Sequence, residues 1–318
     1  MYDRAFRTLF LVNPARLSLE QNHLKIALKN SDEIKVALSD ILCIILESTQ
    51  ITLSVALLEA FALNKILVFS CDKYHLPCGI FTPFLGYYKS LSLLEKQIAL
   101  GVQNKAILWQ QIIKIKIFNQ AKMLEMANSI KADELFILSK NVKLGDSKNY
   151  EATSAMLYFP ALFGKNFKRT EKIQEKSFFI NSALNYGYAI LRGVIVRALC
   201  ASGLNPLLGI FHKNQYSPFN LADDFLEPYR IFVDFCVYEM LKNDDLKNSF
   251  EIKHRTRLAN LINNKIKIEN KSMAISQAIM DSVWSFVRFF ENKNKLIFPL
   301  FDGVSNNGSE IYENFGDV

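Results

Sequence analysis

The sequence predicts an α+β protein in which a β-rich N-terminal domain precedes a larger, all-α C-terminal domain. Before residue 80, short apolar runs alternate with polar breaks, which is typical of a compact β-sheet module. After residue 88, apolar residues recur at helical spacing, as Leu108, Ile112 and Ile115 do. The expected parts are a sheet domain over 1–80, a linker over 81–87 and a helical domain over 88–318.

The N-terminal domain begins with a series of runs that have the length and composition of strands. Their ranges are 7–12, 16–19, 23–28, 34–38 and 41–46. A helix over 53–63 and a buried strand over 66–70 complete the predicted domain. Prolines and glycines then cluster between residues 77 and 86, and we interpret this cluster as the linker.

The C-terminal domain is predicted to consist of long helices. Their ranges are 91–130, 150–162, 177–201, 221–241, 252–262 and 273–291. Pro228 lacks a backbone N–H, so the fourth of these helices should bend or tighten just after Glu227. An apolar segment over 296–301 should dock on the domain, and a flexible acidic tail is expected from about residue 302.

Composition and charge limit the classes of function. The chain has 38 Lys and Arg against 31 Asp and Glu, a formal net charge of +7 that suits a polyanionic partner. It contains neither a G-x-x-x-x-G-K-[ST] loop nor a G-x-G-x-x-G motif, which argues against ATP and dinucleotide cofactors. The five cysteines share no C-x-x-C spacing, and no long apolar segment occurs. These features indicate free thiols, no zinc site, no membrane association and a cytoplasmic location.

A candidate metal site lies between residues 212 and 227. His212 is followed by Asp223, Asp224 and Glu227, and an imidazole with carboxylates can hold Mg²⁺ or Mn²⁺ while leaving positions for phosphate oxygens. Asp224 and Glu227 are three residues apart and would share one helix face, whereas Asp223 should face away. The alternative is that these acids only complement the helix dipole at the start of a helix.

A second segment adds another acidic residue to this site. Ser147 or Asn149 can cap a helix whose first turn carries Glu151. The segments GDSKNYEA, YFPALFGKNFKR, NYGYAILRG and GLNPLLGIFHKNQYSPFNLADDFLEPYR occur in this order along the chain. Together they resemble the CRISPR adaptation integrase family, whose members insert new spacers in antiviral defence. The segments HLPCGIFTPF and WQQIIKIKIFNQAKML are similar to the branch found with single-effector (type II) systems, and the resemblance spans about residues 75–234.

This resemblance implies a site and a reaction. The family's metal-binding and catalytic residues fall on Glu151, His212 and Glu227, with Asp224 as a fourth ligand or as a residue that orients a ligand. Some relatives carry Asp at the place of Glu227, so its longer arm could bind in a different way. The implied activity is that of a DNA endonuclease and integrase that uses Mg²⁺ or Mn²⁺. In this reaction the 3′-hydroxyl of protospacer DNA attacks a phosphodiester of the CRISPR repeat.

The resemblance also implies partners, and basic residues suggest where DNA binds. The family forms a homodimer, which we expect the N-terminal domain to mediate. Two such dimers are bridged by a dimer of a small ferredoxin-like partner, and the RNA-guided effector nuclease is a further candidate partner. Basic residues that follow Glu151 and His212 are candidate contacts to double-stranded DNA. They are Lys165, Lys168, Arg169, Lys172 and Lys213.

Other functions remain open at this point. A metal-dependent nuclease that acts on branched DNA in repair would use the same residues, because water and a DNA hydroxyl are interchangeable nucleophiles at such a site. A purely structural DNA-binding module would account for the basic run but would leave Glu151, His212 and Glu227 unexplained. The basic run itself could also be only a solvated helix face.

Overall fold

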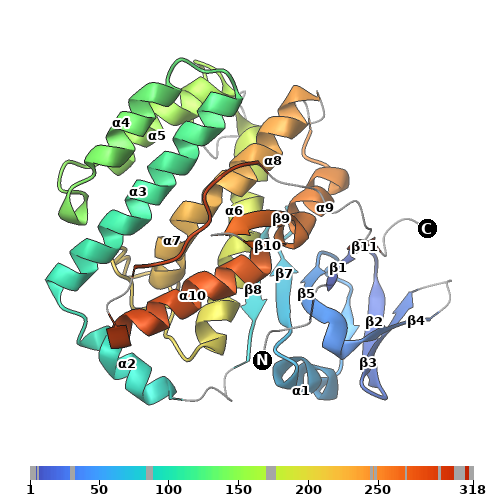
Figure 1. Cartoon of the computed structure of the whole chain (residues 1–318). Helices are drawn as coiled ribbons and strands as arrows, with labels where there is room; N and C mark the ends of the chain where they lie inside the picture. Colours follow the sequence, from blue (N-terminus) through green and yellow to red (C-terminus); the bar gives the residue numbers. More distant parts are fainter. Residues whose placement is uncertain are drawn as a thin grey trace. The chain divides into compact units, whose positions relative to one another are not determined.

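The computed structural model divides the chain into two compact units (Figure 1). The described residues are 5, 7–28, 33–83, 89–169, 177–243, 246, 249–268, 271–292, 295–303 and 312–314. The first unit comprises Met1–Tyr87 and Asn307–Val318, and the second comprises Tyr88–Asn306. Strands dominate the first unit and helices the second, so the predicted α+β class is confirmed.

The first unit contains two sheets and one α-helix. The five-stranded sheet has the order β11(Tyr312–Asn314)-β1(Arg7–Leu11)-β5(Ile41–Leu46)-β7(Leu67–Cys71)-β8(Pro77–Phe81). The four-stranded sheet has the order β4(Ile34–Ala37)-β3(His23–Leu28)-β2(Ala15–Glu20)-β6(Thr52–Leu53). A short 3₁₀ helix, η1 (Leu38–Asp40), precedes β5, and helix α1 (Val55–Leu63) precedes β7. The shared core is built from buried side chains such as Leu9, Ile26 and Phe61.

The sequence patterns explain these elements. β5 is paired in parallel with β1 and β7, and a central parallel strand is covered on both faces, so it reads as the continuous apolar run ILCIIL. α1 begins at a Ser54 cap, whose hydroxyl accepts a hydrogen bond from the Leu57 N–H at 3.3 Å. The predicted strands and the predicted helix of this unit are present, with ends shifted by a few residues.

Two segments of the first unit differ from the expectation. The first part of the proline- and glycine-rich cluster between residues 77 and 86 is the strand β8, which pairs antiparallel with β7 and overlaps the predicted linker only at Phe81. A proline is tolerated there because Pro77 is the first residue of an edge strand. The expected flexible tail returns to the first unit, where β11 pairs in parallel with β1. Residues 304–311 and 315–318 of the tail and residues 84–87 of the linker lie outside the described residues.

The second unit is built mainly from helices. Its α-helices are α2 (Ser90–Ile98), α3 (Val102–Met126), α4 (Ala132–Asn141), α5 (Tyr150–Phe163), α6 (Phe178–Ala201), α7 (Asn220–Leu226), α8 (Arg230–Lys242), α9 (Ile252–Asn260) and α10 (Ile275–Asn292). Short 3₁₀ helices occur at η2 (Leu144–Asp146), η3 (Glu227–Tyr229) and η4 (Leu261–Asn263). In Figure 1 the long helix α3 runs beside α4 and α5, and it also packs against η3.

Several details of the second unit also differ from the expectation. The predicted helix over 91–130 is two helices, because the chain leaves helical geometry around Gly101 before α3 begins. A hairpin of β9 (Lys265–Ile268) and β10 (Lys271–Ala274) makes the unit mostly, rather than entirely, helical. The expected tightening at Pro228 occurs, since η3 separates α7 from α8. Leu296, Phe298 and Phe301 are buried, which confirms the docking of 296–301.

The described helices do not resemble membrane spans. Within the described ranges, no helix is both long enough and apolar enough to cross a bilayer.

Candidate functional site

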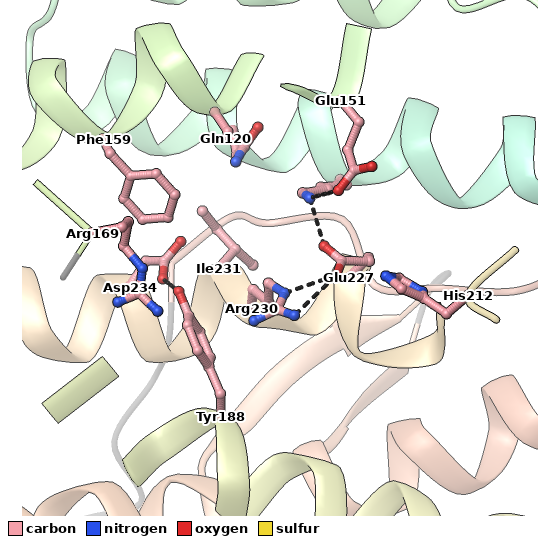
Figure 2. A pocket seen from close by; sticks show the side chains of 12 residues that line it. Gln120, Glu151, Phe159, Arg169, Tyr188, His212, Glu227, Arg230, Ile231 and Asp234 are labelled. Carbon is pink, nitrogen blue, oxygen red and sulfur yellow. Dashed lines mark hydrogen bonds and ion pairs between the residues drawn. The ribbon is translucent and has the colours of Figure 1, made fainter. Parts of the chain in front are cut away.

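A pocket of about 300 Å³ in the second unit brings the predicted site residues together (Figure 2). It is lined by Lys116, Gln120, Glu151, Ala155, Phe159, Arg169, Tyr188, His212, Glu227, Arg230, Ile231 and Asp234. Helices α3, α5, α6 and α8, the turn η3 and two loops contribute these side chains. Glu151, His212 and Glu227, which lie far apart in the sequence, therefore face one cavity.

Glu151 is placed by an aspartate that the sequence interpretation overlooked. Neither predicted cap makes a side-chain hydrogen bond at the start of α5, where Asn149 adopts a left-handed conformation with φ of 53°. The two carboxylate oxygens of Asp146 instead accept the N–H groups of Tyr150 and Glu151, each at 2.9 Å. A carboxylate at a helix N-terminus accepts hydrogen bonds from backbone N–H groups that have no partner within the helix, and it interacts favourably with the helix dipole. The Glu151 backbone is thus fixed while its side chain reaches the pocket.

His212 is oriented by Asp224, whose carboxylate is fully buried. Asp224 Oδ1 lies 2.7 Å from His212 Nδ1 and accepts the His212 backbone N–H at 3.1 Å. Its Oδ2 accepts the N–H groups of Ile210 at 2.5 Å and Phe211 at 3.1 Å. Of the two roles left open for Asp224, this geometry favours orientation of the imidazole, with His212 Nε2 as the ring nitrogen available to a ligand.

The loop that carries His212 is held closely on both sides. Phe211 stacks on Trp109 with ring centroids 4.2 Å apart and planes 3° apart, and Trp109 meets His212 edge-on at 5.7 Å. A side chain at Gly209 would collide with the carbonyl oxygen of His212, so the tight turn requires glycine there. The hydrogen bond to Asp224 raises the pKa of His212 above its ordinary value, although partial burial opposes it.

Glu227 is a buried carboxylate with two cationic neighbours. Its Oε1 accepts a hydrogen bond from Arg230 Nε at 3.0 Å and also lies 3.0 Å from Arg230 Nη2. Its Oε2 lies 2.6 Å from Lys116 Nζ. Burial alone would raise the pKa of Glu227, but Arg230 and Lys116 outweigh it and lower the pKa to about 2. Despite the ion pair with Lys116, Oε2 has no well-aligned hydrogen bond from any described residue. This oxygen therefore retains capacity for another partner.

Lys116 of α3 joins the two glutamates and was missed by the sequence interpretation. Its Nζ lies 2.8 Å from Glu151 Oε1 as well as 2.6 Å from Glu227 Oε2. Burial works against the ammonium, but the carboxylates of Glu227 and Glu151 outweigh it and raise the pKa of Lys116. A signal was present, because Lys116 shares the buried face of α3 with Ile112 and Ile113. A charged residue on an apolar helix face needs a buried partner.

A second buried acid supports the other side of the pocket. Asp234 accepts hydrogen bonds from the hydroxyls of Tyr158, at 3.0 Å, and Tyr188. The guanidinium of Arg230 lies over the Tyr188 ring, 4.6 Å from its centroid. Burial raises the pKa of Asp234 to about 6, although the two tyrosine hydrogen bonds work in the opposite direction. This network holds Arg230, and through it Glu227, in one orientation.

The candidate DNA contacts have different environments. Arg169 lines the pocket and donates to the side-chain oxygens of Asn181 at 2.7 Å and Asn185 at 2.8 Å. Its guanidinium also lies 5.8 Å from the centroids of two pocket-lining aromatic rings. Lys165, Lys168 and Lys213 are exposed. Lys172 lies outside the described residues.

The donor types of this pocket suit a hard divalent ion. Among the described residues, no three His, Cys, Asp or Glu side chains are already close enough to hold a metal. The carboxylates of Glu151 and Glu227 and the imidazole of His212 nevertheless face the same cavity, and these are ligands that Mn²⁺ and Mg²⁺ accept. The position of the Lys116 ammonium shows that a cation is stabilised between Glu151 and Glu227. The residues present therefore fit a metal site.

Comparisons with solved structures agree with this architecture. A casposase bound to integration product aligns with a TM-score of 0.74 and 17% identity, covering 94% of this chain and 96% of that chain. A chain of a Cas6-RT-Cas1–Cas2 complex aligns with a TM-score of 0.72 and 18% identity, covering 96% of this chain and 37% of that chain. At these identities the likeness shows a shared fold.

Sequence comparisons identify the family. Residues 9–267 match the model of the family described as CRISPR associated protein Cas1. The CRISPR-associated endonuclease Cas1 of Neisseria meningitidis serogroup C (strain 8013) is 36% identical over 290 residues, which cover 91% of this chain and 93% of the relative. Both findings agree with the family that the sequence motifs predicted. The chain therefore belongs to the CRISPR associated protein Cas1 family.

Proposed function

We propose that this protein is a metal-dependent DNA integrase that inserts protospacer DNA into a CRISPR array. The observation that carries the proposal is the convergence of Glu151, His212 and Glu227 on one pocket of a Cas1-family chain. It is further supported by a relative named as an endonuclease and by a structural neighbour bound to an integration product. The reaction is a transesterification, in which the 3′-oxygen of the incoming strand bonds to phosphorus as the repeat's own P–O bond breaks.

The residues of the pocket have separate tasks in this reaction. Glu151, Glu227 and the Nε2 of His212 would hold Mg²⁺ or Mn²⁺. The bound ion supplies Lewis-acid polarisation of the phosphate and lowers the pKa of the attacking hydroxyl. Asp224 keeps the imidazole in position, and Arg230 keeps Glu227 in position. Arg169 presents a guanidinium at the pocket, where it can bind a phosphate oxygen.

The proposed partners follow from the same activity. The protein would bind double-stranded DNA of the protospacer and of the repeat, and Lys165, Lys168 and Lys213 offer exposed positive charges for this contact. We further propose a homodimer, a dimer of the small ferredoxin-like partner, and the effector nuclease as an additional partner. One structural neighbour belongs to a complex that contains Cas2. We also propose a cytoplasmic location, since these DNA substrates lie in that compartment.

A nuclease that cleaves branched DNA is the second candidate. Relatives of the chain are named endonucleases, and a water molecule in place of the 3′-hydroxyl would convert strand transfer into hydrolysis. The products separate the two functions. Strand transfer lengthens a labelled strand by joining it to the repeat, whereas hydrolysis only shortens it.

The test is an integration assay with repeat DNA, a short duplex with free 3′ ends, the small partner and Mn²⁺. Glu151→Gln, His212→Ala and Glu227→Gln should each abolish joined products, while duplex binding persists because these ligands act mainly on the transition state. Glu134→Gln is the matched control, since Glu134 forms an exposed ion pair with Lys131. Joined products from the His212 or Glu227 variant at the parent's rate would contradict the proposed site.

A further inference from the structure

The ammonium of Lys116 lies where a ligand-bridging cation would be expected. It is 2.8 Å from Glu151 Oε1 and 2.6 Å from Glu227 Oε2, and the lysine is only 8% exposed. Figure 2 shows that the Glu151 and Glu227 side chains point toward one another across the pocket, and dashed lines mark the ion pairs that each of them makes. A buried ammonium is retained only where nearby charges compensate its desolvation, and these two carboxylates do so.

We propose that Lys116 is an intramolecular counter-ion that closes the metal site at rest. Its ammonium must leave at least one of the two carboxylates before a divalent ion can bind between them. The proposal rests on the proposed function, because it takes Glu151 and Glu227 as the metal ligands. It adds a resting state in which the protein's own cation competes with the metal.

The contacts of Glu227 make this competition direct. Its Oε1 is already engaged by Nε and Nη2 of Arg230, so Oε2 is the oxygen left for a metal. That same oxygen is the one that Lys116 contacts. Mg²⁺ binds carboxylate oxygen at about 2.0–2.1 Å, closer than the 2.8 Å and 2.6 Å contacts of the ammonium. An ion that bridged the two carboxylates would therefore overlap the position of Nζ.

Charge gives a second reason for competition. Glu151 and Glu227 carry two negative charges, and Lys116 and Arg230 carry two positive charges, so this cluster is neutral without a metal. A divalent ion added beside an unmoved ammonium would meet strong repulsion at short range. DNA phosphates supply the missing negative charge and an alternative acceptor for the released ammonium. Metal and DNA should therefore each strengthen the binding of the other.

A purely structural role for Lys116 predicts the opposite behaviour. If the ammonium only neutralised the buried Glu227, it would remain in place when metal bound. Its removal would then leave metal affinity unchanged or would weaken it by loosening the ligands. The two roles are therefore distinguished by the sign of the change in metal affinity.

The first experiment measures Mn²⁺ affinity of the DNA-free protein by isothermal titration calorimetry. Lys116→Met should bind Mn²⁺ tighter than the parent by about tenfold or more, because removal of the competing ammonium leaves Arg230 as the one remaining cation of this cluster beside the two carboxylates. Lys122→Met is the matched control, since Lys122 lies on the same helix in an exposed pair with Glu125. Equal or weaker affinity of the Lys116 variant would overturn the proposal.

A control series separates this inference from the proposed function. Glu151→Gln and Glu227→Gln should abolish Mn²⁺ binding both alone and combined with Lys116→Met. Binding that survives both substitutions would remove the metal from this pocket and overturn the proposed site and the inference together. Binding that depends on both glutamates but does not tighten in Lys116→Met would overturn the inference alone.

A measurement on the unaltered chain covers the case in which the Lys116 variant does not fold. Acetylation of lysine amines with an excess of reagent, followed by peptide mass spectrometry, reports how accessible each amine is. Saturating Mn²⁺ should raise the reactivity of Lys116 several-fold relative to Lys122. An unchanged Lys116 reactivity, with Mn²⁺ binding demonstrated in the same sample, would show that the ammonium stays in place and would overturn the proposal.

Discussion

Asp224 holds His212 through two atoms at once, because its Oδ1 receives both the ring Nδ1, at 2.7 Å, and the backbone N–H of the same residue, at 3.1 Å. The other oxygen receives the two preceding backbone N–H groups. The carboxylate thus fixes the loop and the imidazole together. A change at Asp224 should consequently affect the position of His212 before it affects anything else in the pocket.

We predict that Asp224→Asn lowers strand transfer by about 10–100-fold, the usual effect of losing a partner that orients a ligand. Both oxygens of Asp224 accept N–H groups of the loop that carries His212, and the amide nitrogen of asparagine cannot accept them. The loop would therefore shift. Integration rate at saturating DNA is the measurement. The control is Asp223→Asn, because Asp223 lies on the same helix but pairs with Arg192 at 2.6 Å. Equal losses in both variants would argue against an orienting role.

We predict that Asp234 makes the protein less stable as pH rises from about 4 to about 6. Its pKa is raised from 3.8 to about 6 by burial, so in this window the folded state binds more protons than the unfolded state. Stability that depends on a protonated Asp234 is therefore lost with rising pH, by at most about 3 kcal/mol. Chemical denaturation of the parent and of Asp234→Asn across this range should show a difference that changes with pH. A constant difference would contradict the prediction.

We predict that Arg230→Met destabilises the protein by about 3 kcal/mol, because it breaks a buried ion pair and leaves one oxygen of Glu227 without its partner. The loss should be near the lower end of the usual range, since Lys116 still contacts the other oxygen. Urea denaturation gives the free energy of unfolding. Arg192→Met serves as a control, because the Arg192 side chain is 36% exposed and its pair should contribute little.

We predict that the basic residues after α5 separate into two groups. Lys165→Gln and Lys168→Gln should weaken binding to unrelated duplexes equally and should flatten the salt dependence by roughly one unit per lost phosphate contact. Arg169→Gln should reduce strand transfer by more than it reduces DNA affinity, because Arg169 lines the pocket. Filter binding at several salt concentrations, beside the integration assay, measures both effects. If the salt dependence of DNA affinity is unchanged in these variants, the lysines do not contact phosphates and are only solvated surface residues.

The sequence predicted the elements whose burial is continuous or periodic. β5 and α5 are examples, because an uninterrupted apolar run and a helical stripe are local signals. It also predicted that Glu151, His212 and Glu227 act together, through motifs rather than through spacing. The strand β8 was missed because Pro77 and Gly79 signal a break, whereas an edge strand accepts both.

The rest of the pocket depends on contacts between segments that are distant in the sequence. The roles of Lys116 and Asp234 are apparent only in the folded chain, where α3 and α8 place both side chains at the same cavity. No local pattern reports that a lysine will meet two glutamates from other elements. Asp146 was overlooked for a different reason, since it lies before the expected caps and reaches two N–H groups in the following turn.

The short turn η3 sets the angular register between α7 and α8. A 3₁₀ helix has three residues per turn, so side chains three positions apart are eclipsed rather than staggered. Glu227 and the C-cap residue Arg230 have this spacing, and two nitrogens of the guanidinium lie 3.0 Å from one oxygen of the carboxylate. A continuous α-helix would rotate every later residue of α8 about the helix axis relative to Asp224. The 3₁₀ turn at Pro228 thus sets the rotation of α8 relative to α7. This rotation decides which side chains of α8 line the pocket together with Glu227.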